Sequence, residues 1–362
     1  MVGLTVFIRM KTSDDIQLPD KTSIEKAGQV IRTAELISEE YKKAFDQLSK
    51  WANLYAIPLK HYQISIKLRL FNMKKAKKDY LIGQRLKRMP SIIGKIRRFP
   101  DMKVTRMQDV GGLRIVVKTV DEVNQIHQEI VRNRKKDEVK QFKNYITQPK
   151  NDGYRGIHQV FRYSDSKYPK LRGFNIEVQI RTELQHCWAT AVETLGMINL
   201  ASYKTGEGDE KSRRFFLLAS GVIALKENCP VPEVLKDMTE DAIRKEMIAI
   251  DNELQIISKL GGVVVATPKK KIDKNDFYYL LDLKVDPKGK SQIKILSFSQ
   301  EESTSAEKYY RQRESETQDD HSVSILLIRA DNFKDIRKAY PNYFLDVKRF
   351  LLTIREFLGK SQ

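Results

Sequence analysis

Two neighbouring stretches of this sequence combine acidic, cationic and aromatic side chains in a way that is typical of phosphate chemistry. The first, residues 145–158, is a turn-rich loop in which Pro149 and Gly153 favour a tight backbone path. The second, residues 174–182, alternates strictly between hydrophobic and polar residues, so it predicts a strand with one buried face. Its other face carries Glu177, Gln179 and Arg181. We therefore predict that the loop and the strand contribute to one site.

Two shorter motifs precede the loop, and each is weak by itself. The first is an RxKxxxSxxxK series formed by Arg85, Lys87, Ser91 and Lys95. The second is a DxxGxR motif at the start of a predicted strand, formed by Asp109, Gly112 and Arg114. Asp109 alone is equally compatible with a helix or turn cap. It is the ordered occurrence of all these motifs in one chain that favours a catalytic site.

The motifs lie in a central region whose pattern predicts an α+β fold with a mixed α/β core. Strands are expected at 112–118, 156–164 and 174–182, and helices at 120–133 and 183–199. Upstream, helical spacing over residues 24–55 is expected to end at Pro58, and a basic helix is expected over 64–86. Further helices are expected within 215–227 and 239–260. The sheet is thus expected to carry the polar residues and the helices to cover it.

A smaller β-rich region is predicted beyond residues 268–271, which are typical of a linker. Residues 277–285 and 292–299 predict a hairpin, 322–330 a third strand, and 301–320 either a loop or an exposed helix. A terminal helix is expected after Pro341. We therefore expect two units, residues 1–270 and 271–362.

Composition narrows the classes of function. Only Cys187 and Cys229 occur in 362 residues, so we expect no disulfide framework and no zinc cluster. No hydrophobic run approaches the roughly 20 residues of a bilayer span, so we expect a cytoplasmic protein without a membrane partner. The net charge of +19 is uneven, because residues 60–100 contain 13 Lys or Arg and only one acid, Asp79. The basic segment indicates contact with RNA or with nucleotide phosphates, and we expect no DNA partner. The alternative is that the segment is simply a solvated helix face.

In combination, the motifs resemble the synthetase domain of the RelA/SpoT family, the alarmone synthetases, over about residues 80–195. The resemblance implies a pyrophosphoryl transferase sheet flanked by helices. It also implies transfer of the β,γ-pyrophosphoryl group of ATP to a ribose 3′-hydroxyl, with release of AMP and with Mg²⁺ as the cofactor. The chain carries no His-Asp hydrolase signature before this region, so removal of the product is not expected.

For the donor side, the resemblance assigns roles position by position. It implies that the guanidinium groups of Arg85 and Arg114 stack on adenine. It implies that the ATP phosphates are held by Lys87, Ser91 and Lys95. It further implies that Asp109 and Glu177 hold Mg²⁺ and that Glu177 activates the attacking hydroxyl.

For the acceptor side, the resemblance implies stacking of the acceptor base on Tyr154. Contacts to the acceptor are expected from Lys150, His158, Gln179 and Arg181. The same residues are also compatible with simple packing of Tyr154 on its loop, a strand histidine at 158 and an ion pair between Glu177 and Arg181.

Several departures from the common pattern resemble a toxic branch of small alarmone synthetases, most of all the CapRel family of fused toxins and antitoxins. They include Asn144, Asp152, the sequence after Glu193 and the tail Tyr340-Pro-Asn-Tyr343. This resemblance implies transfer of pyrophosphate to the 3′ CCA end of tRNA, which inhibits translation. It also implies that residues 271–362 form a zinc-finger-like antitoxin module without metal, which restrains the toxin unit and senses a phage capsid protein.

Three questions stay open at the level of sequence. Tyr340 and Tyr343 are either regulatory residues or packing residues of an amphipathic helix. The acceptor is either tRNA or a guanine or adenine nucleotide, since one site would serve both. The chain is either an enzyme or an inactive RNA-binding or scaffold protein, although intact Asp109, Tyr154 and Glu177 argue against inactivity.

Overall fold

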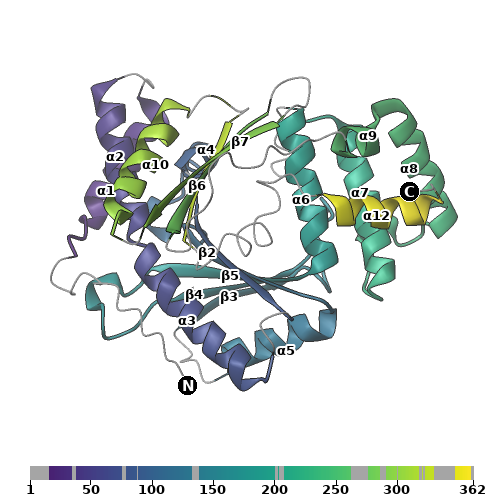
Figure 1. Cartoon of the computed structure of the whole chain (residues 1–362), viewed down its shortest axis with the longest axis horizontal. Helices are drawn as coiled ribbons and strands as arrows, with labels where there is room; N and C mark the ends of the chain where they lie inside the picture. Colours follow the sequence, from purple (N-terminus) through teal and green to yellow (C-terminus); the bar gives the residue numbers. More distant parts are fainter. Residues whose placement is uncertain are drawn as a thin grey trace.

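A five-stranded sheet forms the centre of the computed structural model (Figure 1). The model describes residues 16–34, 38–75, 79–87, 89–132, 138–199, 203, 208–261, 276–285, 291–299, 301–317, 320, 323–329 and 347–359. The strand order is β1-β2-β5-β4-β3, with bounds Leu81–Leu86 (β1), Gly111–Val117 (β2), Val139–Asn144 (β3), Ile157–Arg162 (β4) and Asn175–Thr182 (β5). Only the β2–β5 pair in this sheet is parallel. The predicted mixed α+β class is confirmed.

Helices cover one face of this sheet. α3 (Ala56–Asn72) packs against β1 and β2, and α5 (Val120–Val131) packs against β2 and β5, below the sheet in Figure 1. α1 (Lys21–Thr33) packs against α2 (Glu39–Asn53) and α4 (Met89–Arg98). The hydrophobic residues of the predicted alternation, including Ile176, Val178 and Ile180, are buried in the core that these helices share. The polar residues between them therefore lie on the opposite face of the sheet.

A second core lies to one side of the sheet, on the right in Figure 1. It contains α6 (Glu183–Ile198), α7 (Glu210–Lys226), α8 (Glu240–Leu254) and α9 (Ile256–Gly261). α8 and α9 are separated by Gln255, whose left-handed backbone (φ 54°) ends α8 where one longer helix was expected. Across the described ranges, no helix combines the length and the hydrophobicity needed to cross a bilayer.

The C-terminal part of the chain builds a small antiparallel sheet and then returns to the second core. β6 (Asp276–Val285) lies between β7 (Ser291–Ser299) and β8 (Val323–Arg329), so the predicted hairpin and third strand are confirmed. α10 (Ser303–Glu316) packs on all three strands. Of the two alternatives for residues 301–320, a loop or a helix, the helix is therefore the one observed. β8 also lies against β1 of the first sheet. We call β6, β7, β8 and α10 the C-terminal module.

The terminal helix, α12 (Lys348–Leu358), does not belong to the core of that module. It packs against α6, α7, α8 and α9, with Phe350 and Ile354 fully buried in the second core. The expected boundary at residues 270 and 271, Tyr340 and Tyr343 all lie outside the described residues. The division into two units, the zinc-finger-like nature of the module and the regulatory role of the two tyrosines therefore stay predictions.

Besides the break between α8 and α9, two expectations about local structure are wrong, and one strand was not expected. The basic helix expected over residues 64–86 ends at Asn72, and residues 81–86 form β1, which gains its hydrogen bonds by pairing with β2. Pro58 does not end a helix but lies in the first turn of α3, where its missing N–H costs no helical hydrogen bond. β3 was not expected, because this edge strand is polar and largely exposed and gives little hydrophobic signal.

Candidate active site

Two adjacent rows of residues across the sheet form the floor of the site. The first row consists of Arg85, Gly112 and Glu177, on β1, β2 and β5. The second consists of Gly83, Arg114, Gln179 and His158, on β1, β2, β5 and β4. Glycine and arginine thus alternate between the rows, so each arginine has a neighbour without a side chain. This arrangement opens a pocket over β1, β2 and β5.

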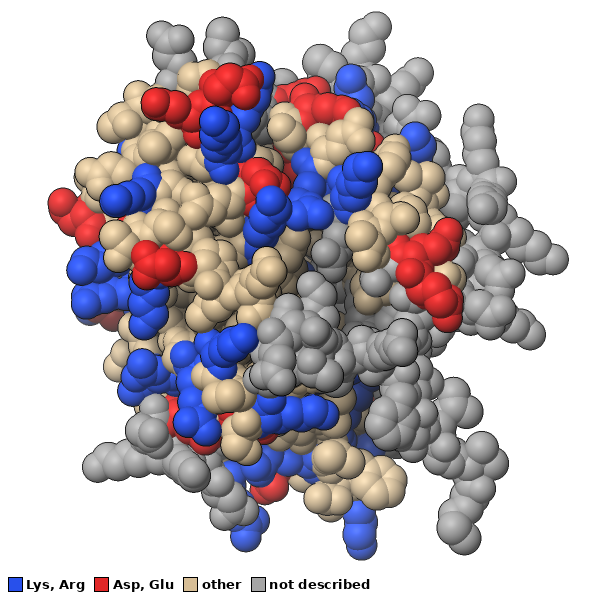
Figure 2. Space-filling model, turned by 90° about the vertical axis from the view of Figure 1, so that its left-hand side faces the viewer, with Lys and Arg blue, Asp and Glu red and all other residues tan. Residues whose placement is uncertain are grey.

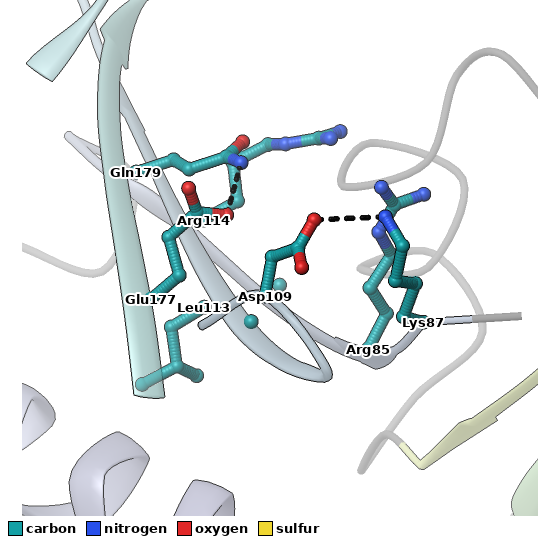
Figure 3. Close-up of a pocket in the computed structure, with 9 residues that line it drawn as sticks. Arg85, Lys87, Asp109, Leu113, Arg114, Glu177 and Gln179 are labelled. Carbon is teal, nitrogen blue, oxygen red and sulfur yellow. Dashed lines mark hydrogen bonds and ion pairs between the residues drawn. The ribbon is translucent and has the colours of Figure 1, made fainter. Parts of the chain in front are cut away.

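The pocket collects most of the predicted donor-binding residues. It is lined by Gly83, Arg85, Lys87, Asp109, Gly112, Leu113, Arg114, Glu177 and Gln179. Figure 3 shows Arg85 and Lys87 on one side, Glu177 and Gln179 on the other, and Asp109 between them. Arg85 and Arg114, predicted to stack on adenine, both belong to this lining.

Asp109 is the electrostatic centre of the donor side. Its two carboxylate oxygens accept hydrogen bonds from Lys87 Nζ at 2.8 Å and from Lys95 Nζ at 2.9 Å. Burial opposes ionisation of Asp109, but the two lysines outweigh it and hold its pKa at about 2. Burial lowers the pKa of Lys87, and Asp109 partly offsets this. Two of the three predicted phosphate-binding residues, Lys87 and Lys95, thus converge on one acid. The third, Ser91, lies on α4 one turn before Lys95.

A closed circuit of contacts connects four predicted acceptor residues to Glu177. The Tyr154 hydroxyl lies 2.5 Å from His158 Nε2, and His158 Nδ1 lies 2.7 Å from Glu177 Oε1. Gln179 Nε2 donates to Glu177 Oε2 at 2.8 Å, and Arg181 Nη2 donates to Gln179 Oε1 at 2.5 Å. The Arg181 guanidinium carbon then lies 4.9 Å from the centroid of the Tyr154 ring. A direct Glu177–Arg181 pair is therefore not formed, because Gln179 bridges the two.

This circuit keeps Glu177 ionised. Burial raises the pKa of Glu177, but the hydrogen bond and charge of His158 and the hydrogen bond of Gln179 bring it below its ordinary value. Each ring nitrogen of His158 faces one partner, Nδ1 the Glu177 carboxylate and Nε2 the Tyr154 hydroxyl. The carboxylate is thus held in its ionised form, the form that can accept a proton.

The loop at 145–158 is tied to the second core. Gly153 has φ 87°, and its carbonyl accepts a hydrogen bond from the Ser220 hydroxyl of α7 at 2.5 Å. A Cβ at Gly153 would lie 2.9 Å from Ser220 Cβ, so glycine is required both for conformation and for space. The buried Arg155 donates to the carbonyls of Ile146 and Pro230 at 3.1 and 2.9 Å. The loop is therefore a fixed support for Tyr154.

Tyr154, on which the acceptor base is predicted to stack, lies within a cluster of cationic and aromatic side chains. Its ring is in contact with two cations, since Lys150 Nζ lies 5.2 Å from the centroid in addition to Arg181. Its edges meet Tyr145, His158 and Trp188. The aromatic platform is thus present, within a packed cluster.

Sequence reasoning missed two of the residues that line the pocket, Gly83 and Leu113, and left some predicted residues beside the pocket. Gly83 lines the pocket, and a glycine within a strand was the available signal. Four predicted acceptor residues, Lys150, Tyr154, His158 and Arg181, form a cluster beside the pocket, joined to it through Glu177 and Gln179.

The donor set fits a magnesium ion. Asp109 and Glu177 line the same pocket from different segments, and both are ionised at neutral pH. Mg²⁺ in proteins commonly binds through one or two carboxylates together with water and substrate phosphates. Asp109 and Glu177 would hold the ion, which when bound supplies positive charge to the transferred group.

Comparison with known proteins identifies the class of this domain. Residues 84–207 match the family model described as "Region found in RelA / SpoT proteins". The chain is 36% identical over 119 residues to the GTP pyrophosphokinase YjbM of Bacillus subtilis, covering 32% of this chain and 56% of that protein. It is 31% identical over 145 residues to the probable chloroplastic GTP diphosphokinase CRSH of Arabidopsis thaliana, covering 38% and 24%. The chain thus spans about half of the first relative's length.

Solved structures of small alarmone synthetases are also similar to part of the chain. Small alarmone synthetase 1 of Bacillus subtilis bound to its product pppGpp has 25% identity and a TM-score of 0.44, covering 58% of this chain and 99% of that one. A GTP pyrophosphokinase family protein of Streptococcus pneumoniae has 23% identity and a TM-score of 0.41, covering 59% and 98%. From the family match and the sequence relatives, residues 84–207 form a RelA/SpoT-family synthetase domain. The CapRel branch stays a prediction.

Proposed function

We propose that this chain is an ATP-dependent pyrophosphokinase that acts on a ribose 3′-hydroxyl. The observation that carries the proposal is one pocket in which two arginines and a lysine face two ionised carboxylates. A triphosphate donor is strongly anionic, so its reaction requires cations at the phosphates and a carboxylate at the nucleophile. The relatives that share this domain are named as GTP pyrophosphokinases or diphosphokinases, which supports the same reaction type.

The geometry suggests how the chain's own groups divide the work on the donor side. Arg85 and Arg114 bind the adenine by stacking, and Lys87, Ser91 and Lys95 hold the phosphates. The bond that breaks is the one between the β-phosphorus of ATP and the oxygen that bridges it to the α-phosphorus. That oxygen leaves as part of AMP and keeps the electron pair of the bond. The lysines now on Asp109 would turn to the phosphates, which carry more charge than one carboxylate.

On the acceptor side, the new bond forms between the 3′-oxygen and the β-phosphorus. Glu177 accepts the proton of the 3′-hydroxyl, and His158 and Gln179 hold its carboxylate in place. Tyr154 stacks on the acceptor base, while Lys150 and Arg181 supply positive charge to its phosphates. Each group thus acts from the side of the site on which it lies.

For the acceptor we propose the 3′ CCA end of tRNA, supported by the net charge of +12 over residues 60–100. Some of these basic side chains bind other groups of the same chain. Arg69 donates hydrogen bonds to the carbonyls of Glu129 and Arg132, and Lys75 forms an ion pair with Glu122. Figure 2 shows further Lys and Arg side chains gathered in the lower half of one face, with few acidic residues among them. Such a surface attracts a polyanion.

A guanine nucleotide is the second candidate acceptor, because the related proteins YjbM and CRSH are named for GTP. We also propose that the C-terminal module restrains the site and that a phage capsid protein releases it as an antiviral defence that stops translation. The position of β8 against β1, the strand that carries Arg85, supports the restraint. The resemblance to fused toxins and antitoxins supports the trigger.

The test is to incubate the purified protein with γ-labelled ATP and either deacylated tRNA or a mixture of GDP and GTP, with and without a candidate capsid protein. Glu177→Gln is the inactive control, because it keeps the shape of the side chain and removes the base. Label on tRNA only with capsid protein is the expected result. Label on free nucleotide with tRNA unlabelled would replace tRNA by the second candidate, and no label on either would refute the proposed reaction.

A further inference from the structure

One buried carboxylate connects the C-terminal module to the nucleotide-binding helix. Glu314 of α10 is 2% exposed, and its Oε1 accepts a hydrogen bond from the backbone amide of Met89 at 2.7 Å. Met89 is the first residue of α4, the helix that carries Ser91 and Lys95. The contact joins residues 225 positions apart in the chain. It is therefore a tertiary contact between the module and the site, not a local turn.

The module presents this carboxylate from a fixed position. The Tyr310 hydroxyl, one turn earlier on α10, donates to the same Glu314 oxygen at 2.7 Å. Tyr310 packs in the core of the module with Leu280 and Ile325. Arg313, the residue directly before Glu314 on the helix, pairs at 2.8 Å with Asp282 of β6, which is itself buried. A rotation of Glu314 away from Met89 would thus have to break contacts within the module.

The start of α4 is also the place where a triphosphate is expected. The first amides of a helix point outward without partners within the helix, and its dipole favours a negative group there. Lys87 lies two residues before Met89, Ser91 lies in the first turn and Lys95 in the second. In this structure the Glu314 carboxylate accepts the hydrogen bond of the first amide of α4. The Asp109 carboxylate accepts hydrogen bonds from both Lys87 and Lys95. Two acids of the chain thus bind groups that an incoming phosphate needs.

We propose that Glu314 is the residue through which the C-terminal module restrains the synthetase site. Its carboxylate binds the start of α4 in place of a substrate phosphate and repels the triphosphate that Lys87, Ser91 and Lys95 would hold. Withdrawal of α10 removes that charge and exposes the amide. This inference rests on the proposed function, because it takes the pocket to be an ATP site.

The alternative role for Glu314 is a helix cap that only stabilises α4, and the two roles predict opposite effects on nucleotide binding. Glu314→Gln keeps the size of the side chain and removes its charge. If Glu314 competes with phosphate, this full-length variant should bind a non-hydrolysable ATP analogue on the order of tenfold more tightly than the wild type. If Glu314 is only a cap, binding should be unchanged or weaker.

The experiment measures the Kd of the analogue by calorimetry for the wild type, Glu314→Gln and a matched control, Glu316→Gln. Glu316 lies at the exposed end of the same helix, and its hydrogen bonds are only to Gln312 and Arg313. The Kd of the Glu316→Gln variant should therefore equal that of the wild type. Unchanged or weaker binding by Glu314→Gln, or equal tightening by both variants, would overturn the proposal.

A second measurement on the wild type covers the case in which Glu314→Gln does not fold. Saturation with the analogue should increase amide hydrogen exchange in residues 303–316, because phosphate displaces the Glu314 contact and loosens α10. Unchanged or slower exchange there would overturn the proposal. Both measurements report binding and do not depend on transfer. Tighter binding of the analogue by Glu314→Gln without any pyrophosphoryl transfer would refute the proposed function alone. Transfer together with unchanged binding would refute this inference alone.

Discussion

Replacing Asp109 by Asn should reveal how strongly the two lysines depend on this carboxylate. The pKa of Asp109 is held at about 2 against an ordinary value of 3.8, and at 1.36 kcal/mol per pH unit this difference corresponds to about 2 kcal/mol of folding stability at neutral pH. Because the folded-state pKa is the lower one, the contribution is complete above pH 3.8 and is lost as the pH falls through 2. Roughly half of it should remain at pH 3.

Asparagine has the shape of a protonated aspartic acid, so the difference between wild type and Asp109→Asn should follow the same course. We expect the variant to be less stable by about 2 kcal/mol at pH 7 and by about half of that at pH 3. The assay is urea unfolding followed by tryptophan fluorescence, since Trp51 is buried in the same core as the sheet. Asp46→Asn is the control, because Asp46 is half exposed and pairs only with Lys50 on the surface, which predicts a loss below about 0.5 kcal/mol. Equal stability of wild type and Asp109→Asn at pH 7, or a difference independent of pH, would refute the electrostatic reasoning.

Three further predictions concern the acceptor loop and the terminal helix. Tyr154→Ala should abolish transfer with an unchanged circular dichroism spectrum, whereas Tyr154→Phe keeps the ring and should retain part of the activity; full activity of the alanine variant would contradict the stacking role. Gly153→Ala forces a Cβ against Ser220 and a strained left-handed residue, so it should weaken acceptor binding and leave affinity for an ATP analogue unchanged; equal loss of both affinities in calorimetry would argue against a local effect. Phe350→Ala should lower the free energy of unfolding by about 3–5 kcal/mol, and Leu352→Ala, at a half-exposed position of the same helix, by less than about 1 kcal/mol; similar losses would show that α12 is not seated in the second core.

The position of α12 changes how a truncation should be designed. A fragment that ends near residue 271 loses the C-terminal module and also the helix that covers α6, α7, α8 and α9. Loss of activity in such a fragment would then follow from an exposed hydrophobic core. Point substitution at Glu314 leaves that core intact, so it separates restraint from stability.

The strand-borne half of the site was predictable because alternation along β5 assigns Glu177, Gln179 and Arg181 to one face irrespective of any partner. Asp109 and Arg114 followed from the DxxGxR motif, which begins two residues before β2 and ends in the middle of that strand. β1 was missed because a lysine-rich stretch precedes it and its strand conformation depends on pairing with β2. Local pattern carries no information on such pairing.

The contacts that join distant segments were beyond sequence reasoning for a physical reason. The Glu314–Met89 hydrogen bond depends on how α10 packs on its sheet and how that sheet meets β1. The return of α12 to the second core likewise depends on which hydrophobic surface is left uncovered by α6, α7, α8 and α9. The amphipathic spacing of α12 predicted a buried face but not its partner.

The most direct measurement is a parallel reaction with ATP labelled at the α- or the γ-phosphate, an acceptor present, and the products separated by chromatography. Transfer of a pyrophosphoryl group predicts that the γ-label moves to the acceptor, that the α-label ends in AMP, and that both changes disappear in Glu177→Gln. Transfer of the α-label to the acceptor, or formation of ADP in place of AMP, would contradict the account of this site.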